Sequence, residues 1–380
     1  MPESALVTFQ VVNGTWADCS SADQTVEIAL TDGGTLSAAQ VNDLSVAGTA
    51  NCYVVSAPGT YVFNARVRGN GAGEGVGFEP AIEMADGMTA DWLWTDSEGL
   101  VSGVALDTTS GDIFLTVGEG RGNALVALMQ DGKVVWSWHV WVTDAPQTMT
   151  YGNGTVFMDR NLGAAGTTAG GTDAYGMYYQ WGRKDPFYGG EKTETSANAF
   201  LEAKNGTVVN PAYPALDWAF SKSATTTEGA AANPMTFYND KVGTGYNWLA
   251  SPNATLWGEA KTLNDPCPPG YRVPGTGAWE DLISGRQYID GVSVWDGTNY
   301  GMTYTHGGQT AWYPAQGYRN YSSGAIVGLR SSTGAYWSAE TSSVKSYYLF
   351  FRSKLSSSGS INNELDMNRS YGYTVRCCKE

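Results

Sequence analysis

The sequence predicts a protein that is mainly β with some α and that begins with an antiparallel, immunoglobulin-like β-sandwich. Charged residues make up only 16% of the 380 residues, whereas Gly (48), Tyr (22) and Trp (14) are abundant. The apolar runs of the first 150 residues are short, rich in β-branched and aromatic residues, and bounded by turn residues. None of these runs has convincing 3.6-residue periodicity, so strands joined by tight turns explain them better than helices do.

Seven segments of the first part share this pattern, and we predict them to be strands: 6–12, 25–30, 52–55, 61–63, 113–117, 124–128 and 134–142. The turn Ala57-Pro58-Gly59 separates 52–55 from 61–63, and we expect these two strands to form a hairpin. The tripeptide Gln130-Asp131-Gly132 joins the last two segments, and it predicts a second hairpin.

The rest of the chain contains few regular runs. One helix is predicted from Thr276 to Arg286, because Trp279, Leu282 and Ile283 fall on one helical face. A closing strand is predicted over 371–378, where side chains alternate between two faces of the strand.

Composition changes sharply near residue 150. Residues 1–150 contain 4 basic and 18 acidic residues, whereas residues 151–380 contain 18 basic and 19 acidic ones. Two of the 22 tyrosines precede residue 150 and twenty follow it. The polar stretch 143–148 contains Pro146, which restricts the preceding residue, and it is the candidate joint. We therefore expect two domains, an acidic β-sandwich over 1–147 and a second domain over 148–380.

Charge and composition argue against several classes of function. A net charge of −15 makes nucleic acid an unfavourable partner, and no stretch approaches the ~20 apolar residues of a membrane span. The sequence contains no Walker loop, no GxGxxG loop opening a helix and no GxSxG elbow. The segment 366–372 only faintly matches a calcium loop, because its glycine is one place late. We therefore expect no cofactor, no metal site and no catalytic residue.

Two histidines and three carboxylates are the candidates for metal binding or acid–base chemistry. His139 is predicted to be a half-exposed strand residue and His306 a loop residue, neither with a metal-ligand partner at suitable spacing. Asp185, Glu280 and Asp281 lie near aromatic residues, as the carboxylates of glycoside hydrolases do, but no spacing makes two of them converge. We expect solvated acids and caps here. The many Trp and Tyr residues fit core packing first and sugar-stacking platforms second.

The chain has five cysteines, Cys19, Cys52, Cys267, Cys377 and Cys378, with no CxxC spacing. Such a sparse set fits one or two bridges in an oxidising compartment, or buried thiols, and whether Cys19 pairs with Cys52 stays open. The first residues lack the basic start and apolar run of a signal peptide. The chain is then either cytosolic or an exported protein given without its signal, and its composition favours the second.

Several strings resemble the fimbrillin-family surface proteins of Bacteroidales, and others resemble the Fibrobacter succinogenes major paralogous domain, which is often found at the C-terminus of such proteins. The fimbrillin-like strings are 50–61, 135–144, 157–164 and 178–187. The strings similar to the paralogous domain are Cys-Pro-Pro-Gly-Tyr-Arg-Val-Pro (267–274), Ala-Tyr-Trp-Ser-Ala (335–339) and Tyr-Thr-Val-Arg-Cys (373–377).

The resemblance implies a C-type-lectin-like α+β fold for 148–380, a fold that is similar to that of formylglycine-generating enzymes. The paired active-site cysteines of that enzyme and the calcium–sugar signature of the lectins are missing from this sequence. In the resembled domain the Cys-Pro-Pro-Gly segment and the Val-Arg-Cys strand recur together, which implies a disulfide between Cys267 and Cys377. Strand alternation favours Cys377 over Cys378 for the inward position, although both could also stay reduced.

These features together lead us to expect a cell-surface, non-enzymatic protein, an adhesin or fimbrial tip subunit that displays a lectin-like domain. Its expected partners are a glycan, a host or bacterial surface protein, and other fimbrial subunits. The ligand-binding residues cannot be named from the sequence. The alternative is a carbohydrate-active or formylglycine-generating-type enzyme built on the same fold. An enzyme requires convergent titratable groups in a cleft, whereas a binding protein can use aromatic and amide groups on an open face.

Overall fold

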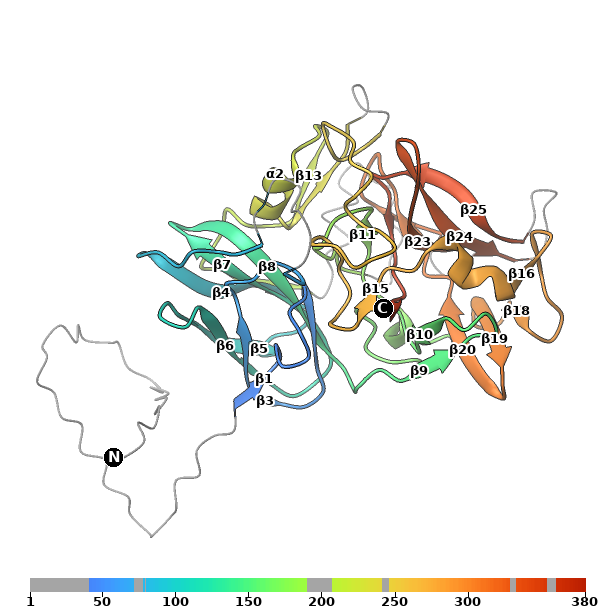
Figure 1. Ribbon diagram of the computed structural model, residues 1–380, viewed down its shortest axis with the longest axis horizontal. Helices are drawn as coiled ribbons and strands as arrows, with labels where there is room; N and C mark the ends of the chain where they lie inside the picture. Colours follow the sequence, from blue (N-terminus) through green and yellow to red (C-terminus); the bar gives the residue numbers. More distant parts are fainter. Residues whose placement is uncertain are drawn as a thin grey trace, which may run out of the picture. The chain divides into compact units, whose positions relative to one another are not determined.

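The computed structural model describes residues 41–71, 78, 80–189, 207–240, 246–328, 333–353 and 360–380. The strands predicted at 6–12 and 25–30, and Cys19, lie outside the described residues. All the helices and strands described below belong to the unit that runs from Asn42 to Glu380, except that the first residue of the first strand is Val41. The described elements are strands with a few short helices, so the mainly β class with some α is confirmed (Figure 1).

Two sheets make up the first part, drawn mostly in blue to teal in Figure 1. The four-stranded sheet has the order β1 (Val41–Asp43), β3 (Gly59–Asn64), β6 (Asp112–Val117), β5 (Val101–Asp107). The five-stranded sheet has the order β12 (Val208–Val209), β4 (Met88–Thr95), β7 (Gly122–Gln130), β8 (Lys133–Val142), β2 (Cys52–Val55). The strand β12 comes from the second part of the chain and pairs with β4.

The two sheets share one hydrophobic core, which makes them a β-sandwich. In β6 the buried residues Ile113, Leu115 and Val117 alternate with more exposed ones, as expected for a strand with one face in the core. They pack in the same cluster as Trp136 and Trp138 of β8. The alternation of buried and more exposed residues along β6 therefore reflects sheet-on-sheet packing.

Of the two predicted hairpins, one is present and the other is not. The strands β7 and β8 pair antiparallel through a turn in which Asp131 and Gly132 both have positive φ, 51° and 71°. The hairpin predicted between 52–55 and 61–63 is wrong, because β2 pairs parallel with β8 while β3 pairs with β6 in the other sheet. The two strands face each other across the core instead, with the rings of Tyr53 and Phe63 5.1 Å apart.

The second part consists of small sheets. Two of these sheets have four strands, in the orders β15–β27–β10–β9 and β11–β26–β21–β22. Two others have three strands, in the orders β18–β19–β20 and β23–β24–β25. Their strands are β9 (Thr148–Thr150), β10 (Val156–Met158), β11 (Tyr179–Gln180), β15 (Tyr271–Arg272), β18 (Ser293–Asp296), β19 (Gly301–His306), β20 (Gln309–Pro314), β21 (Tyr318–Arg319), β22 (Ile326–Val327), β23 (Thr333–Ser342), β24 (Lys345–Arg352), β25 (Ile361–Asn368), β26 (Gly372–Tyr373) and β27 (Cys378–Lys379).

Two strand pairs and three short helices complete the described elements. The pairs are β13 (Ala219–Ser221) with β14 (Thr236–Tyr238), and β16 (Ile283–Ser284) with β17 (Gln287–Tyr288). The helices are η1 (Thr172–Ala174), α2 (Thr227–Ala232) and η2 (Thr276–Leu282). Helix α2 packs beside β8 of the sandwich (Figure 1).

The predicted helix from Thr276 to Arg286 is shorter and of a different type than expected. It is the 3₁₀ helix η2, which ends at Leu282. The chain then forms the β16–β17 pair, whose turn has Gly285 and Arg286 at positive φ, 56° and 66°. The left-handed backbone of these two residues is incompatible with a continuing helix.

The predicted closing strand is divided between two sheets. Its first half, β26, pairs with β11 and β21, and its last residue belongs to β27, which pairs with β10 and β15. Every residue from Gly372 to Cys378 is buried. The alternation of the sequence therefore marks two faces that both lie inside the protein.

Residues on both sides of the expected domain boundary at 147 share a hydrophobic cluster. The five-stranded sheet places Trp94 and Trp141 in the same buried cluster as Trp181 and Trp257 of the second part. Its opposite face lies in the sandwich core. The division into 1–147 and 148–380 stays a prediction, and two separated units would expose this common cluster to water. No helix in the described part of the chain is long and apolar enough to cross a membrane.

Candidate functional site

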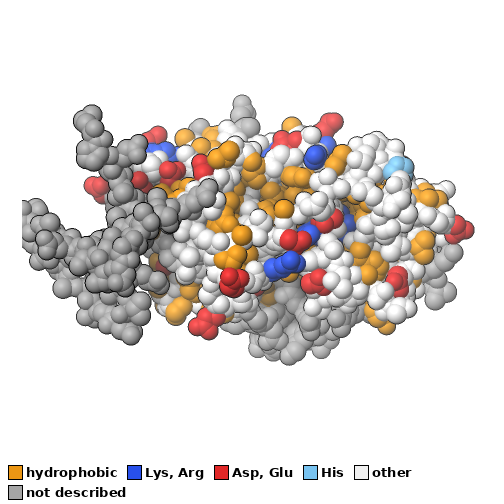
Figure 2. Space-filling view, turned by 90° about the horizontal axis from the view of Figure 1, so that it is seen from below, with side chains coloured by type: hydrophobic (Ala, Val, Ile, Leu, Met, Phe, Trp, Pro, Cys, Tyr) orange, Lys and Arg blue, Asp and Glu red, His pale blue; other side chains and the backbone are white. Residues whose placement is uncertain are grey.

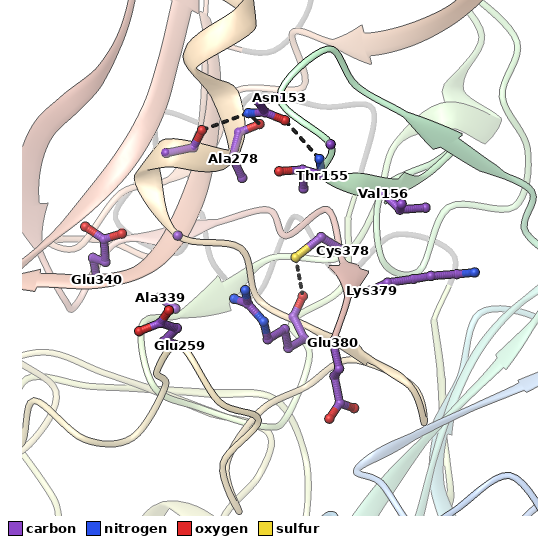
Figure 3. A pocket seen from close by; sticks show the side chains of 14 residues that line it. Asn153, Thr155, Val156, Glu259, Ala278, Ala339, Glu340, Cys378, Lys379 and Glu380 are labelled. Atoms are coloured by element: carbon purple, nitrogen blue, oxygen red, sulfur yellow. Dashed lines mark hydrogen bonds between the residues drawn. The ribbon is translucent and has the colours of Figure 1, made fainter.

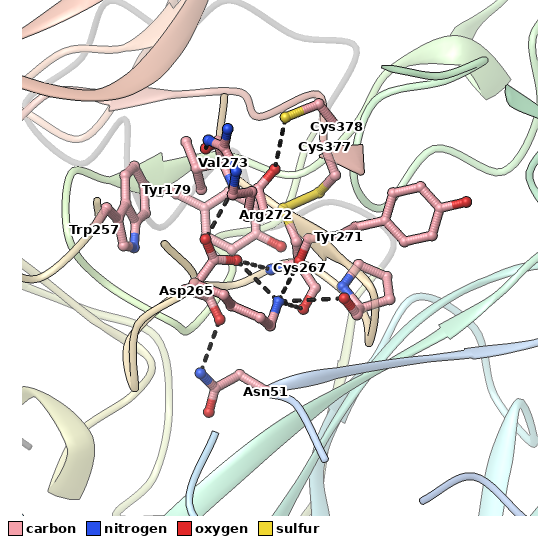
Figure 4. Close-up of a disulfide and its surroundings, with 12 residues drawn as sticks. Asn51, Tyr179, Trp257, Asp265, Cys267, Tyr271, Arg272, Val273, Cys377 and Cys378 are labelled. Carbon is pink, nitrogen blue, oxygen red and sulfur yellow. Dashed lines mark hydrogen bonds and ion pairs between the residues drawn. A yellow bond between two sulfur atoms is a disulfide. The ribbon is translucent and has the colours of Figure 1, made fainter. Parts of the chain in front are cut away.

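A disulfide joins Cys267 to Cys377, the same pair that the family resemblance implies (Figure 4). Their Cα atoms are 6.0 Å apart, and 110 residues separate them in the chain. The bridge ties the segment before β15 to the residue before β27, and both cysteines are fully buried. Cys52 and Cys378 are free and buried.

The free thiol of Cys378 points away from this bridge. Its Sγ lies 3.7 Å from the carbonyl oxygen of Arg272, and burial raises its pKa to about 11 (Figure 4). The thiol is therefore protonated at neutral pH, and a protonated thiol is a poor nucleophile. Cys377 is oxidised and Cys378 is protonated, so neither offers the thiolate that cysteine chemistry requires.

A buried ion pair supports the disulfide. Lys261 Nζ donates to Asp265 Oδ1 at 3.2 Å and to the carbonyl oxygens of Cys267, Pro268 and Tyr271 at 2.8, 3.2 and 2.5 Å. Asn51 of the first part donates from Nδ2 to the carbonyl oxygen of Asp265 at 2.9 Å. The ammonium group is thus fully used in holding the backbone around the bridge, which is a structural role.

The prediction that His139 is half-exposed is wrong, because its side chain is only 1% exposed. Its Nε2 lies 2.8 Å from Asn123 Oδ1, and its Nδ1 lies 3.4 Å from the Tyr179 hydroxyl. Burial lowers the pKa of His139 to about 3, so the ring is neutral. The second part covers the face of β8 that alternation had suggested was solvated.

Asn123 also links His139 to a carboxylate. Its Nδ2 donates to Asp96 Oδ2 at 2.6 Å and to the carbonyl oxygen of Gly163 at 2.9 Å. Burial raises the pKa of Asp96 to about 6, although the hydrogen bonds from Asn123 oppose this shift. The contacts of this group are structural, and Asp96 binds a proton at a higher pH than an exposed carboxylate does.

His306 occupies the end of β19 and is exposed, rather than lying in a loop as predicted. Its ring stacks at 6.4 Å from that of Tyr304 on the same strand. Among the residues that the structure describes, no three His, Cys, Asp or Glu side chains lie close enough to hold a metal ion.

The three carboxylates singled out from the sequence do not converge. Asp185 was expected to be solvated, but it is buried and accepts hydrogen bonds from Lys184 Nζ at 2.5 Å and Ser137 Oγ at 2.6 Å. Glu280 and Asp281 lie on η2, where Asp281 accepts from the backbone N–H of Asn153. Asp185 is held against β8 of the sandwich and Asp281 is bonded to the loop at Asn153, so these two acids do not form an acid–base pair.

The structure instead gathers four tyrosines from three segments that lie far apart in the sequence. We define the tyrosine cluster as Tyr246, Tyr318, Tyr321 and Tyr371, all of them partly exposed. Ring centroids are 4.6 Å apart for Tyr246–Tyr321, 4.9 Å for Tyr321–Tyr371 and 5.6 Å for Tyr318–Tyr371. The contacts are T-shaped or tilted, as the quadrupoles of aromatic rings favour.

Buried aromatic rings support the tyrosine cluster from below. Tyr371 and Tyr318 contact the ring of Tyr373 at 5.6 and 5.7 Å, and Tyr373 contacts Trp337 at 4.3 Å and Tyr348 at 4.9 Å. These three deeper rings are at most 5% exposed. The outer tyrosines therefore rest on a packed foundation and keep a fixed arrangement.

The backbone around the cluster is also fixed. Tyr246 adopts a φ of 64°, which is unfavourable for a residue with a side chain, and its carbonyl oxygen accepts from the N–H of Ser370 at 3.2 Å. Arg319, between Tyr318 and Tyr321 in the chain, donates to the carbonyl oxygens of Tyr188 and Gly324, both at 2.6 Å. Strained backbone held by its surroundings is a common property of binding sites.

The hydroxyls of the cluster are available for hydrogen bonds. Within the described residues, none of the four hydroxyls has a hydrogen-bond partner. Burial raises the pKa of Tyr371 to about 12 and also raises that of Tyr318. These phenols are therefore protonated at neutral pH and can both donate and accept. The sequence could not reveal this site, since its members lie up to 125 positions apart and only the excess of Tyr after residue 150 hinted at it.

Figure 2 shows one face of the molecule, on which acidic and basic side chains are interspersed with hydrophobic and uncharged ones.

No family model, no curated protein and no solved structure matches the chain in comparisons with known proteins. The function must therefore be argued from the residues of this chain alone.

Proposed function

We propose that this protein is a surface-displayed, non-catalytic adhesin or fimbrial tip subunit that binds a neutral carbohydrate through the tyrosine cluster. The observation that carries the proposal is the exposure of four mutually packed tyrosines with unused hydroxyls. An aromatic face suits the C–H face of a pyranose ring, and phenolic hydroxyls suit the sugar hydroxyls at its edge. Rigid aromatic platforms also lose little side-chain entropy on binding.

Two further features support display outside the cell. The disulfide between Cys267 and Cys377 is typical of an oxidising compartment. The resemblance to fimbrillin-type surface proteins, carried by the strings quoted above, points to the same place.

The test is a glycan-array screen with the full chain, followed by calorimetric titration of the best neutral oligosaccharide. We expect Tyr321→Ala and Tyr371→Ala each to weaken binding roughly tenfold through the loss of ring contact. Tyr321→Phe should keep the stacking and lose only the hydroxyl contribution, so its effect should be smaller than that of Tyr321→Ala.

The matched control is Tyr300→Ala, because Tyr300 is 40% exposed and lies outside the cluster. Circular dichroism and thermal unfolding of each variant would verify that the fold is retained. Sugar binding that survives Tyr321→Ala and Tyr371→Ala unchanged, or an array with no carbohydrate ligand, would contradict the proposal.

A further inference from the structure

A pocket lies at a separate place, beside the disulfide (Figure 3). Its volume is about 620 Å³, within the usual range for small-molecule sites. The loop at 153–156, the start of η2, the end of β23 and the strand β27 surround it. Its described lining contains no aromatic side chain, unlike the tyrosine cluster, so it lacks the means to stack a sugar ring.

Internal hydrogen bonds hold the walls of the pocket in place. Asn153 Nδ2 donates to the carbonyl oxygens of Gly277 and Ala278 at 3.0 and 3.2 Å, which fixes the loop against η2. Glu340 accepts from the backbone N–H of Thr276 at 3.0 Å and from its hydroxyl at 2.9 Å. The pocket is therefore formed before any ligand arrives, which lowers the entropic cost of binding.

Charged side chains of both signs line this pocket: Glu259, Arg272, Glu340, Lys379 and Glu380. Within the described residues, no ion pair of 4.0 Å or less joins any two of them. Arg160 elsewhere in the chain shows the contrast, because its guanidinium contacts Asp144 at 2.8 Å. Opposite charges around a hollow that do not pair with one another remain available to a ligand.

The two basic side chains of the lining come from neighbouring strands. Arg272 and Lys379 belong to the neighbouring strands β15 and β27, where Arg272 pairs with Cys378 and Tyr271 pairs with Lys379. The side chains of Arg272 and Lys379 therefore leave opposite faces of this strand pair, and only Arg272 is used as a ligand contact below. Figure 3 shows Glu259 and Glu340 together on one side, with Lys379 on the other. A carboxylate placed near Arg272 and an ammonium group placed near Glu259 would each meet a charge of opposite sign.

We propose that this pocket binds a short peptide with both ends free, its carboxylate at Arg272 and its ammonium group at Glu259. Because the lining carries charges of both signs, it favours a ligand that also carries both over one with a single sign of charge. The volume exceeds what a single small amino acid fills, which favours a di- or tripeptide. This site is independent of the carbohydrate site proposed above, so either can fail without the other.

In the test, trialanine, its N-acetylated form and its C-amidated form are each titrated into the full chain, and binding is followed by calorimetry and by NMR. The unmodified peptide should bind, and blocking either end should weaken binding roughly 3- to 10-fold, since each charge contact is partly exposed to solvent. N-acetylation removes the ammonium group and amidation removes the carboxylate.

Two variants assign the ends. With Glu259→Gln, unmodified and N-acetylated trialanine should bind equally, whereas with Arg272→Gln the unmodified and amidated forms should bind equally. Lys133→Gln is the control, because Lys133 is an exposed residue at the start of β8 and does not line the pocket. The proposal is overturned if trialanine shows no saturable binding up to about 10 mM. Equal binding of blocked and free peptides to the wild-type chain would overturn it as well.

Discussion

Replacement of Asp96 by Asn should make the protein more stable above pH 6 and leave it nearly unchanged near pH 4. Asp96 follows β4, and its carboxylate accepts a hydrogen bond from Asn123 Nδ2 at 2.6 Å. Burial raises its pKa from 3.8 to about 6. Asn has the same shape and can still accept from Asn123, but it cannot ionise.

The sign follows from the direction of this pKa shift. The folded protein holds the Asp96 proton more tightly than the unfolded chain does, so this group favours folding at pH values below its unfolded pKa. That contribution is lost as the pH rises from about 4 through about 6. A shift of about two pKa units corresponds to about 3 kcal/mol in the free energy of unfolding. Because Asp96 keeps partial contact with solvent, we expect about 1–3 kcal/mol.

The assay is urea-induced unfolding of the wild-type chain and of Asp96→Asn at several pH values from about 4 to about 8. The difference in unfolding free energy should grow with pH in favour of the variant. Asp107→Asn is a matched control of opposite direction, because hydrogen bonds from Thr109 and Ser110 lower the pKa of the exposed Asp107. A difference for Asp96→Asn that does not depend on pH would refute the reasoning.

Three other substitutions test separate parts of the structure. Cys377→Ser should lower the free energy of unfolding by about 4–5 kcal/mol, because it opens a 110-residue loop in the unfolded chain, and denaturant unfolding would measure this. The wild-type protein should lose stability between about pH 6.5 and pH 4, because His139 gains a proton there only in the unfolded chain. In His139→Gln this loss in the free energy of unfolding should be smaller by about 2–3 kcal/mol, which thermal melts at several pH values would measure. Gly334→Ala should destabilise by about 1–3 kcal/mol, because a Cβ there would lie 2.0 Å from the Phe351 ring, whereas Gly258→Ala, with its nearest atom at 3.5 Å, should be nearly neutral in the same melts.

Some features of the site followed from local sequence and others did not. Strand parity favours Cys377 over Cys378, and Cys377 is the cysteine that forms the bridge, but both residues are buried because both faces of this segment lie inside the protein. The same argument failed for His139, since it assumed that one face of β8 meets water. The structure buries both faces, one in the sandwich and one under the second part. Asp185 differs from expectation for the same reason, because Ser137 of β8 and Lys184 enclose it.

The sequence by itself determined the mainly β class, the positions of most strands in the first part and the Asp131-Gly132 turn. These depend on residues next to one another, whose alternation and turn preference act over a few positions. Only the tertiary structure decided that β2 pairs with β8 rather than with β3, and that the tyrosine cluster forms from three distant segments. Pairing and burial depend on what covers each face, and that surface is supplied by chain far away in sequence.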